Sequence, residues 1–537
     1  MPTGIKVLQE AGKGNGHQGK DERKQTVAQG EQRVEISLRS LLEGVEVRSG
    51  LPAGDLKIRQ VVNDSRKVQA GALFVAIHGE TTDGNLYAKG AVEHGAAAIL
   101  SESPAPTDWR REIPWIQVNQ ARKALAIAAA NFYGQPAKAL TLAGVTGTNG
   151  KTTTTSLIDS IVRASGAKAG LFGTIAYHTP LGERAAPNTT PESVDLQSFF
   201  AEIRDAGGTY ATMEASSHAL AMDRLWGCHF ATAVFTNLTR DHIDYHKTFE
   251  NYFAAKRRLF EGTGAGAADV AVINTDDEWG KKLVGLGKKT LTYGLQNGTD
   301  LRAKKFQLSF QGLSFTAHAP NGAIQVESAL VGRINVYNIL AAIGAGMGLG
   351  FSNEVIEAGI RSLKAVAGRF QRIDQGQPFL VVVDYAHTDD ALENLIRTAR
   401  ELNVKGRIIT LFGCGGARDR TKRPIMGEIS GRLSDLSILT SDNPRQEDPL
   451  KIISDIVVGM QKSGGKYMIE PDRAKAIVLA IEEAHAGDIV LLAGKGHEDY
   501  QVFADHTIHL DDRELARKAL VDRGYSEPPR NGGGFGT

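Results

Sequence analysis

Apolar and polar positions alternate most regularly in the last third of the chain. Short apolar runs rich in Val, Ile and Leu are separated by helical stretches of ten or more residues. This pattern predicts parallel strands joined by helices, as in a doubly wound sheet. The predicted strands are residues 380–383, 407–412, 436–440, 467–469 and 489–493.

The middle of the chain shows a related alternation, beginning with the apolar run 140–143. Further strands are predicted at residues 209–213 and 231–235, and a helix at residues 249–260. Residues 291–331 alternate as antiparallel hairpins do, and an Ala-rich helix opens after them. We expect this helix to end a central domain built on a mostly parallel sheet.

A smaller α/β pattern precedes the central domain. Apolar runs at residues 58–62, 71–79 and 97–100 predict strands, and residues 85–95 predict a helix. Residues 1–33 are rich in Gly, Lys, Gln and Glu and have neither helical nor strand periodicity, so we expect a disordered leader.

Together these patterns predict an α/β protein with three domains, because the chain is too long for a single core. The predicted ranges are a disordered leader at 1–33, a small N-terminal α/β domain at 34–138, a central domain with a mostly parallel sheet like that of P-loop ATPases at 139–366, a Rossmann-like doubly wound C-terminal domain at 367–524 and a flexible tail at 525–537.

Composition narrows the class of partner. The 537 residues include 62 basic and 61 acidic ones, and a net charge of +1 offers no electrostatic footprint for nucleic acid or an anionic membrane. Two distant cysteines indicate neither a disulfide framework nor a zinc site. No run approaches the ~18 to 20 apolar residues of a membrane span, and the N-terminus lacks the apolar core of a signal peptide. We expect a cytoplasmic protein, monomeric by default, that acts on small molecules.

The glycine-rich stretch 144–154 is the strongest candidate for chemistry. It directly follows the apolar run 140–143 and reads GVTGTNGKTTT. Spaced glycines let backbone N–H groups turn toward an anion, Lys151 adds a mobile charge, and a helix from Thr152 directs its positive end to the same place. The strict phosphate-loop spacing fails because residue 145 is Val. We therefore predict a variant phosphate-binding loop for ATP or GTP.

Two polar residues follow the neighbouring strands. Glu214 and His242 lie just beyond the predicted strands 209–213 and 231–235, and the carboxyl ends of parallel strands meet at one edge of a sheet. A carboxylate beside a triphosphate suits Mg²⁺, and the Thr152 hydroxyl is a second oxygen ligand. Taken singly, Glu214 could cap a helix and His242 could be structural. Their common edge favours a metal site.

Polar clusters also follow four strands of the last domain, again on one edge. Arg418 and Arg445 offer two forks for carboxylates, and Glu498 offers a carboxylate for an ammonium group. This set suits a zwitterionic amino acid. No GxGxxG stands at the first turn of this domain, which argues against dinucleotide binding.

The order of motifs resembles that of the Mur ligases over residues 58 to 515. The motifs are DSR, GALFVA, TGTNGKTTT, NTTPE, MEASSH, TRDHIDYH, AAK, NVYN, GRF, DYAH, GCGG, DNPR and GKGHE. Within the family the chain is most similar to the members that extend UDP-MurNAc-L-Ala-D-Glu, and its DNPR sequence is similar to that of members using meso-diaminopimelate rather than lysine. The resemblance implies that the three domains bind the UDP end, ATP and the incoming amino acid respectively.

The resemblance also implies the chemistry. ATP would phosphorylate the γ-carboxylate of D-Glu, and the amine of meso-diaminopimelate would attack the acyl phosphate. Catalysis would rest on Lys151, Glu214, His242 and Lys256, with Mg²⁺, expected as two ions, held by Thr152, Glu214, His242 and Lys256. Lys256 would carry a CO₂-derived carbamate, although its helix alone indicates only a solvated basic face. The ATP contacts would be Gly147, Thr148, Asn149, Gly150, Lys151, Thr152, Thr153 and Asn338.

The substrate contacts follow from the resemblance in the same way. Those implied for the UDP end are Ser65, Thr81 and Thr82, and those for the muramoyl dipeptide are Asn188, Thr189, Thr190, Ser216 and Arg224. Those implied for the amino acid are Arg418, Asp442, Asn443, Pro444, Arg445, Gly494 and Glu498. The chain departs from the family pattern at Met222, where relatives can have Gln, and at Ala417, where Asp is usual.

Three alternatives stay open at this stage. The chain could add L-lysine instead of meso-diaminopimelate, or act as a folylpolyglutamate synthase, which shares the phosphate loop. It could also be a non-catalytic interaction protein with a Mur-ligase-like body. The DSR and DNPR motifs argue against the second alternative, and the intact set of reactive residues argues against the third.

Overall fold

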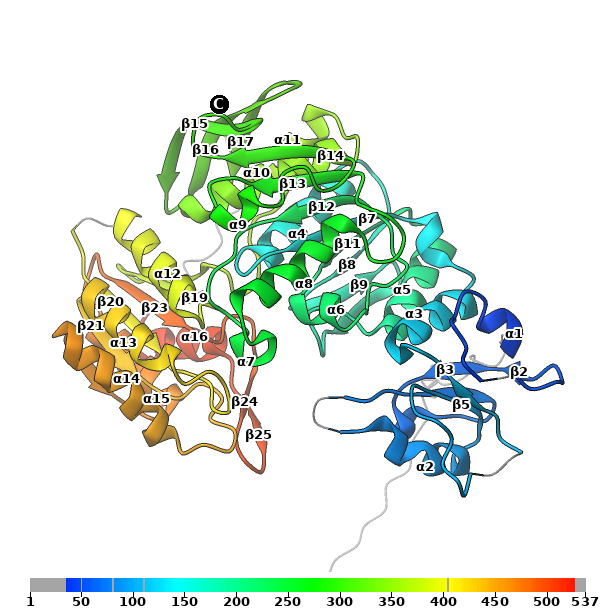
Figure 1. Ribbon diagram of the computed structural model, residues 1–537. Coiled ribbons are helices and arrows are strands. Elements are labelled where there is room, and N and C mark those ends of the chain that lie inside the picture. Colours follow the sequence, from blue (N-terminus) through cyan, green and yellow to red (C-terminus); the bar gives the residue numbers. More distant parts are fainter. Residues whose placement is uncertain (1–34, 50, 80–81, 110–111, 403–404, 527–537) are drawn as a thin grey trace, which may run out of the picture.

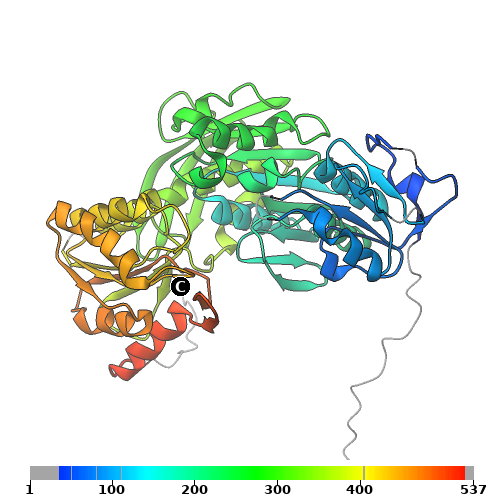
Figure 2. The ribbon, with the colours of Figure 1, turned by 60° about the horizontal axis from the view of Figure 1, so that its bottom comes forward.

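The protein is described by a computed structural model that covers residues 35–49, 51–79, 82–109, 112–402 and 405–526. The predicted leader lies outside these ranges, and so does nearly all of the predicted tail. Within them no helix combines the length and apolar character that crossing a bilayer requires. Figure 1 and Figure 2 show an N-terminal and a C-terminal domain on opposite sides of a central domain, which confirms the predicted three-domain α/β architecture.

The N-terminal domain is built on a parallel four-stranded sheet with the order β3-β4-β5-β6. The predicted strand 58–62 is divided, because Ile58 pairs with Ile36 in a separate ribbon and only Gln60–Val62 joins the sheet. The predicted helix 85–95 begins as a 3₁₀ turn, where Asp83 accepts a hydrogen bond from the N–H of Asn85. The elements are β1 (Ile36–Ser37), α1 (Leu38–Leu41), β2 (Lys57–Ile58), β3 (Gln60–Val62), η1 (Ser65–Lys67), β4 (Ala72–Ala76), η2 (Gly84–Tyr87), α2 (Ala88–Glu93), β5 (Ala96–Ser101), β6 (Trp115–Gln117), α3 (Ala121–Phe132) and η3 (Pro136–Ala139).

The central domain contains an eleven-stranded sheet with the order β10-β9-β8-β11-β7-β12-β13-β14-β15-β16-β17. Strands β8, β11, β7, β12, β13, β14 and β15 are parallel to their neighbours within this run. Its strands are β7 (Thr141–Thr146), β8 (Ala169–Phe172), β9 (Ala176–Thr179), β10 (Gly182–Ala185), β11 (Tyr210–Glu214), β12 (Phe230–Phe235), β13 (Val270–Asn274), β14 (Lys289–Gly294), β15 (Leu301–Ser309), β16 (Gly312–Ala319) and β17 (Gly322–Ser328).

One prediction for this sheet was partly wrong. Residues 291–331 were predicted as antiparallel hairpins, but β14 pairs in parallel with β13, and only β15 to β17 form hairpins. Alternation of apolar and polar residues marks a half-exposed strand and does not reveal the direction of its partner. A strand inside the parallel run can therefore look like part of a hairpin.

Helices cover both faces of the central sheet. One core packs α4, α10 and α11 against the sheet, and the other packs α5 and α8 against the opposite face. Both faces of the parallel run are therefore buried under apolar side chains, and polar functional groups can gather only at its edges, where the strands end. The helices are α4 (Lys151–Ala164), α5 (Ser193–Asp205), α6 (Ser217–Ala221), α7 (Ile243–His246), α8 (Phe249–Glu261), α9 (Glu278–Lys281), α10 (Arg333–Gly348) and α11 (Asn353–Ser362).

The C-terminal domain has the predicted doubly wound sheet, with the order β18-β19-β23-β20-β21-β22. The five predicted strands are all present and parallel, while β18 and the hairpin β24–β25 were not predicted. The elements are β18 (Gln371–Ile373), β19 (Leu380–Asp384), α12 (Asp389–Leu402), β20 (Ile408–Phe412), α13 (Lys422–Leu433), β21 (Leu436–Leu439), α14 (Pro449–Ser463), β22 (Tyr467–Ile469), α15 (Arg473–Glu483), β23 (Ile489–Ala493), β24 (Tyr500–Val502), β25 (Thr507–His509) and α16 (Asp512–Asp522).

Candidate active site

The glycine-rich loop joins β7 to α4 and cannot tolerate side chains at two positions. Gly147 and Gly150 have φ angles of +148° and +83°. A Cβ on Gly147 would lie 1.9 Å from Oγ1 of Thr236, and one on Gly150 would lie 2.4 Å from Oδ1 of Asn338. The glycines thus let the loop pass close to its neighbours while the N-terminus of α4 faces the cavity described below.

Two lysines converge on the same backbone carbonyl of this loop. Nζ of Lys151 donates to the carbonyl oxygens of Gly147 at 3.1 Å and Thr148 at 2.7 Å. Nζ of Lys256, on α8, donates to the Gly147 carbonyl at 2.7 Å. Neither forms an ion pair with a carboxylate of the described residues. Both side chains therefore donate to neutral carbonyls, and both line the cavity where an anionic ligand could bind.

Burial affects the pKa of both lysines. It lowers the pKa of Lys151, and burial together with the nearby charge of Lys151 brings the pKa of Lys256 well below its ordinary value. Lys256 is 1% exposed and its ammonium position lies over the ring of Tyr252. A depressed pKa makes the neutral, nucleophilic amine accessible near neutral pH.

Glu214 ends β11 and is held by its neighbour Thr174. The backbone N–H of Thr174 donates to Oε1 of Glu214 at 2.8 Å, and the Thr174 hydroxyl donates to Oε2 at 3.1 Å. Glu214 is 1% exposed, yet it lines the same cavity as Thr152. Each carboxylate oxygen keeps a lone pair for a further ligand.

His242 stands in the left-handed region, with φ +53°, directly before α7. Its Nε2 lies 3.2 Å from Oδ2 of Asp241, and its ring packs edge-on against His218. Desolvation lowers the pKa of His242, the charge of Asp241 opposes this shift, and the charges of His218, Lys256 and Lys151 add to it. A bulky residue in this conformation stores strain, and such strain gathers at functional sites.

The residues at this cavity are too few to hold Mg²⁺ alone, but they fit the ion when a bound phosphate or water supplies further oxygens. The described residues contain no group of three or more His, Cys, Asp or Glu side chains arranged to hold a metal ion. Thr152 and Glu214 nevertheless place two hard oxygens on one cavity wall beside the phosphate loop. Mg²⁺ is commonly bound by one or two protein groups plus waters and phosphate oxygens, which matches this donor set.

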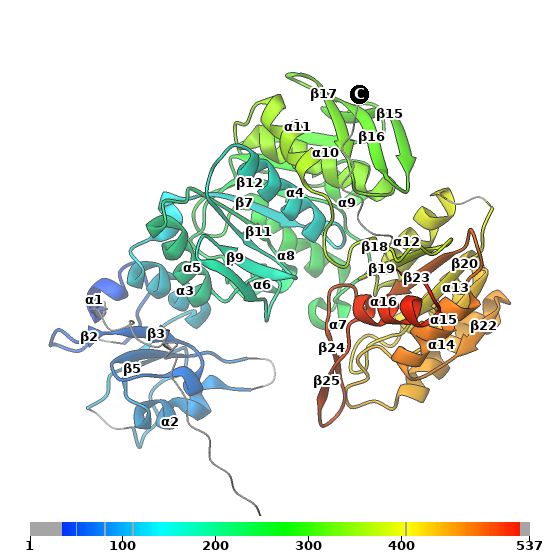
Figure 3. The same cartoon turned by 180° about the vertical axis from the view of Figure 1, so that it is seen from behind.

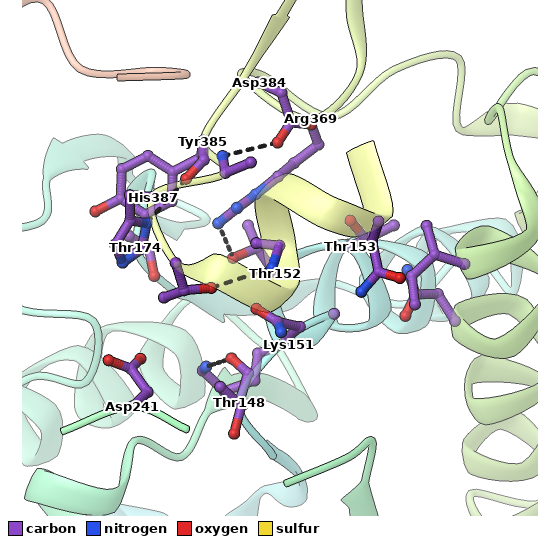
Figure 4. A pocket seen from close by; sticks show the side chains of 18 of the residues that line it. Thr148, Lys151, Thr152, Thr153, Thr174, Asp241, Arg369, Asp384, Tyr385 and His387 are labelled. Carbon is purple, nitrogen blue, oxygen red and sulfur yellow. Dashed lines mark hydrogen bonds between the residues drawn. The ribbon is translucent and has the colours of Figure 1, made fainter. Parts of the chain in front are cut away.

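A cavity of about 250 Å³ gathers the predicted catalytic set. Figure 4 shows Lys151 and Thr152 from the central domain facing Arg369, Tyr385 and His387 from the C-terminal domain. Of the residues assigned from sequence, those lining it are Thr148, Asn149, Gly150, Lys151, Thr152, Thr153, Thr189, Glu214, Ser216, His242, Lys256 and Asn338. Residues widely separated in sequence therefore meet between two domains.

Asn338, on α10, joins this cavity to a smaller one. It is 5% exposed, accepts a hydrogen bond from the Thr154 hydroxyl at 3.4 Å and lines both cavities. The smaller cavity, of about 200 Å³, is also lined by Asp276, Tyr337 and Asp390. Its position beside the phosphate loop suits the nucleoside end of a nucleotide.

A third cavity, of about 500 Å³, lies over the polar edge of the C-terminal sheet. Of the predicted amino-acid contacts it is lined by Arg418, Asp442, Asn443, Arg445, Gly494 and Glu498. Pro444 does not line it. The 250 Å³ and 500 Å³ cavities share the wall residues Asp241, His242, Tyr385, His387 and Thr388. A group activated at the phosphate loop would therefore be next to a molecule held by the C-terminal domain.

Arg418 and Arg445 have no carboxylate partner among the described residues. Arg418 donates to the carbonyl of Ala417 at 3.2 Å, and Arg445 to that of Gly416 at 2.9 Å. Burial and the neighbouring Arg418 charge lower the pKa of Arg445. Ala417 and Arg445 both have positive φ, at +52° and +53°. Two uncompensated guanidinium groups at one cavity suit a ligand with two carboxylates.

Glu498 is already oriented by a buried cation. Nζ of Lys495, which is 0% exposed, donates to Oε2 of Glu498 at 2.9 Å and to Oδ1 of Asn443 at 3.0 Å. Nδ2 of Asn443 donates to the same Glu498 oxygen at 3.0 Å. Within the part of the chain that the structure describes, Oε1 of Glu498 has only a long contact, 3.5 Å, with the Tyr385 hydroxyl. That oxygen is the one left for a ligand ammonium group.

The residues predicted to contact the muramoyl dipeptide are linked by hydrogen bonds to one another or to neighbouring residues. Thr190 is fully buried and donates to the Glu214 carbonyl at 2.7 Å, with Ser216 3.1 Å away. Arg224 donates to the Thr190 carbonyl at 2.9 Å and pairs with Glu192 at 2.7 Å. The carbonyl of Asn188 accepts from Tyr177, while Thr189 contacts Thr174 at 3.2 Å. Thr190 and Arg224 thus hold residues 190–192 in place, whereas Thr189 and Ser216 line the 250 Å³ cavity.

The predicted contacts to the UDP end lie apart from these cavities, in the N-terminal domain. Ser65 opens the turn η1, which Asp64 caps by accepting from the N–H of Arg66 at 3.0 Å. The Thr82 hydroxyl lies 3.1 Å from the Tyr87 hydroxyl. Thr81 falls outside the described residues.

Sequence reasoning missed several residues at the domain interface. Arg369 entered the sequence analysis only as part of the GRF motif, but it donates to the Thr152 hydroxyl at 3.0 Å and stacks on Tyr385. Asn149 donates to Asp390 of the C-terminal domain at 2.6 Å. The GRF motif was the only signal for Arg369, and no sequence signal pointed to Asp390.

Three family models match the chain in order. They are described as the Mur ligase family catalytic domain over residues 57–133, the Mur ligase middle domain over 145–346, and the Mur ligase glutamate ligase domain over 368–496. A protein of Solibacter usitatus named UDP-N-acetylmuramoyl-L-alanyl-D-glutamate–2,6-diaminopimelate ligase is 53% identical, covering 86% of this chain and 94% of its own. The chain belongs to the Mur ligase family.

Other relatives agree with this assignment. A Geobacillus kaustophilus protein with the same name is 45% identical, with 91% of this chain and 99% of that protein covered. A solved structure with that name is 34% identical, with a TM-score of 0.64, and covers 92% of this chain and all of its own. A folylpolyglutamate synthase from Mycobacterium tuberculosis complexed with ADP is only 15% identical, with a TM-score of 0.57 over 69% of this chain and 91% of its own, and shares the fold alone.

His497, in the GKGHE loop, leads to a prediction about how stability depends on pH. Its ring packs against that of Tyr385. Burial and the charges of Arg369 and Arg513 lower the pKa of His497 to about 4. In the unfolded chain its pKa is near 6.5, so between these values the unfolded state binds more protons and stability falls as pH falls. For this one histidine, the free energy of unfolding falls by at most about 1.4 kcal/mol per pH unit in this range.

We expect His497→Gln to lose less stability than the wild type between pH 7.5 and 5.0, measured as the shift in urea midpoint. His485→Gln is the matched control, because the His485 side chain is 75% exposed. Equal losses in the wild type and His497→Gln would show that His497 is not held neutral.

Proposed function

We propose that this Mur ligase adds meso-diaminopimelate to the γ-carboxylate of D-Glu in UDP-MurNAc-L-Ala-D-Glu, with hydrolysis of ATP to ADP and phosphate. The product is a precursor of peptidoglycan. The observation that carries the proposal is the wall shared by the phosphate-loop cavity and the cavity of Arg418 and Arg445. The names and high coverage of the relatives support the same reaction.

The first step is transfer of a phosphoryl group. A γ-carboxylate oxygen of D-Glu attacks the γ-phosphorus of ATP, the bond to the β-phosphate oxygen breaks, and ADP leaves with the electron pair. Lys151 and the N–H groups of the Gly147–Gly150 loop bind the phosphates and stabilise their charge. Mg²⁺, expected as two ions, would be held by Thr152, Glu214, His242 and Lys256 and would neutralise phosphate charge.

The second step makes the amide bond. The neutral amine of diaminopimelate attacks the acyl carbon, the C–O bond to phosphate breaks, and the amine gives up a proton as the amide forms. Cavity residues orient the two reactants, and this positioning accounts for much of the rate gain. Arg369, which contacts Thr152, adds a positive charge from the C-terminal domain beside the phosphate loop.

Lys256 is proposed to carry a carbamate. Its lowered pKa favours the neutral amine, which adds to CO₂ to form an N–C bond with release of a proton. The product is an anion where the structure has two lysine side chains sharing the Gly147 carbonyl. An ammonium group there would repel a metal ion, whereas a carbamate would attract one.

The nucleophile is selected by the C-terminal domain. Meso-diaminopimelate has two carboxylates, and Arg418 and Arg445 are two unpaired guanidinium groups. Lysine has one carboxylate and would leave one of them without a partner, which disfavours the lysine-adding alternative. The amino-acid site around Glu498 is shaped by Asp442, Asn443, Pro444 and Gly494.

The remaining assignments complete the proposal. Ser65, Thr81 and Thr82 bind the UDP end, and the loop of Asn188, Thr189, Thr190, Ser216 and Arg224 binds or shapes the site of the muramoyl dipeptide. The domain ranges are those predicted from sequence. We place the enzyme in the cytoplasm as a monomer, in keeping with the two buried free cysteines. A non-catalytic interaction protein would not require Lys151, Glu214, His242 and Lys256, and their presence argues against that alternative.

The proposal predicts which amino acid releases phosphate. With ATP, Mg²⁺ and UDP-MurNAc-L-Ala-D-Glu, phosphate release should require meso-diaminopimelate, whose kcat/KM should exceed that of L-lysine by roughly 10- to 100-fold for one lost charge-assisted contact. Arg445→Gln should narrow this ratio. The control Arg420→Gln, in the loop that carries Arg418 and with a side chain 68% exposed, should keep the wild-type ratio. Preference of the wild type for lysine would refute the specificity.

A second prediction concerns Lys256. Lys256→Ala should lose phosphate release by about 100-fold or more, since the proposed carbamate that would help to hold Mg²⁺ beside the phosphates is removed, while ATP binding is largely kept. In ¹³C-bicarbonate the wild type should give a carbamate carbon signal that this variant lacks. Arg257→Ala, on the same helix with a side chain 46% exposed, is the control and should keep both. Full activity of Lys256→Ala would remove the carbamate from the mechanism.

A further inference from the structure

A buried ion pair lies beneath the amino-acid cavity. Arg473 begins α15 and Asp512 begins α16, and both side chains are 0% exposed. Nε of Arg473 donates to Oδ1 of Asp512 at 2.8 Å, and Nη2 donates to Oδ2 at 2.6 Å. Figure 3 shows α15 and α16 in the C-terminal domain, and their apolar residues pack together in one core against its sheet.

The same guanidinium also reaches two loops of the cavity. Nη1 of Arg473 donates to the carbonyl of Ser441 at 3.3 Å, and Nη2 donates to the carbonyl of Ala493 at 3.0 Å. Ser441 directly precedes Asp442, and Ala493 directly precedes Gly494. Each acceptor is therefore one residue before a residue that lines the cavity.

No strand ladder makes this connection. Ser441 follows β21 and Ala493 ends β23, and in the sheet these two strands are separated by β20. Arg473 bridges the two loops across the end of β20. Its planar fork can serve four acceptors at once, which a lysine ammonium group with three donors cannot do.

We propose that Arg473 and Asp512 are a positioning pair for the amino-acid site. Asp512 fixes the guanidinium, and the guanidinium sets the spacing between the loop that carries Asn443 and Arg445 and the loop that carries Glu498. The ligand-binding groups then stand at a fixed separation before the amino acid arrives. Neither Arg473 nor Asp512 lines the 500 Å³ cavity, so they act through the backbone.

Stability alone does not account for the pair. Desolvation of two buried charges offsets most of their attraction, and an apolar pair of the same volume is often as stable. An apolar pair would, however, leave the Ser441 and Ala493 carbonyls without the donor that holds them. The geometry therefore points to positioning of these two loops.

The chain provides a matched control at the opposite edge of the same sheet. Arg407 precedes β20 and donates to Oδ2 of Asp488, which precedes β23, at 2.7 Å. The Asp488 side chain is 5% exposed. This pair ties the amino ends of two strands and touches no cavity loop, so its loss should affect stability only.

The test compares Asp512→Asn, the milder Arg473→Lys and the control Asp488→Asn in the full-length protein, at a temperature where each is folded. Amide hydrogen exchange should accelerate at residues 441–445 and 494–498 in the first two variants and not in the control. The KM for meso-diaminopimelate should rise about 10-fold or more in the first two, with the KM for ATP changed less than about twofold, because small misplacements of binding groups are costly.

The kinetic arm rests on the proposed function, whereas hydrogen exchange does not. A wild type without diaminopimelate-dependent phosphate release would refute the proposed function, and the exchange data would still decide whether the pair positions the loops. Unchanged exchange and unchanged KM in folded Asp512→Asn and Arg473→Lys would overturn the positioning role. The same changes in Asp488→Asn would overturn it too, because they would reflect general destabilisation.

Discussion

The active site is organised around two lysine side chains that share one carbonyl oxygen. Lys151 and Lys256 come from different helices, and both donate to Gly147 without an ion-pair partner among the described residues. Desolvated like charges at such a position are unfavourable until an anion arrives or one group loses its charge. Phosphate binding and the carbamate proposed for Lys256 would each relieve this repulsion.

Sheet topology explains why this charge lies beside the amino-acid site. Both large sheets are mostly parallel, so their polar loops gather at carboxyl edges, and the two edges face each other across a wall that includes His242 and Tyr385. The central domain can then activate a carboxylate while the C-terminal domain holds the amine. Contacts such as Arg369 with Thr152 and Asn149 with Asp390 join the domains at that wall.

The sequence predicted those parts of the site that depend on local patterns. The phosphate loop follows from a strand, spaced glycines and Lys151, and Glu214 and His242 follow from their places after parallel strands. The family resemblance added Lys256, whose helix alone indicated a solvated face, whereas the residue is 1% exposed. The strands of the C-terminal sheet were predicted for the same local reason, and β14 was misread because alternation does not encode the direction of a partner strand.

The parts that sequence did not predict depend on contacts between distant segments. Arg473 is a buried cation whose partners lie in other loops and in α16, and nothing in its local sequence distinguishes it from a surface residue. The GKGHE motif contains Lys495 but does not reveal that this lysine is buried against Asn443 of another loop. The substrate contacts of Thr190 and Arg224 stay predictions from the resemblance, and the hydrogen bonds that these residues make to backbone carbonyls were not predicted. Such roles arise only when the tertiary fold brings the partners together.

The central claim is that the phosphate loop activates a carboxylate by phosphorylation. It is tested most directly with UDP-MurNAc-L-Ala-D-Glu labelled with ¹⁸O in the γ-carboxylate, followed by mass analysis of the released phosphate. The account predicts one ¹⁸O atom in the inorganic phosphate for each amide formed, with ADP as the nucleotide product. Unlabelled phosphate, or release of AMP carrying the label, would contradict it.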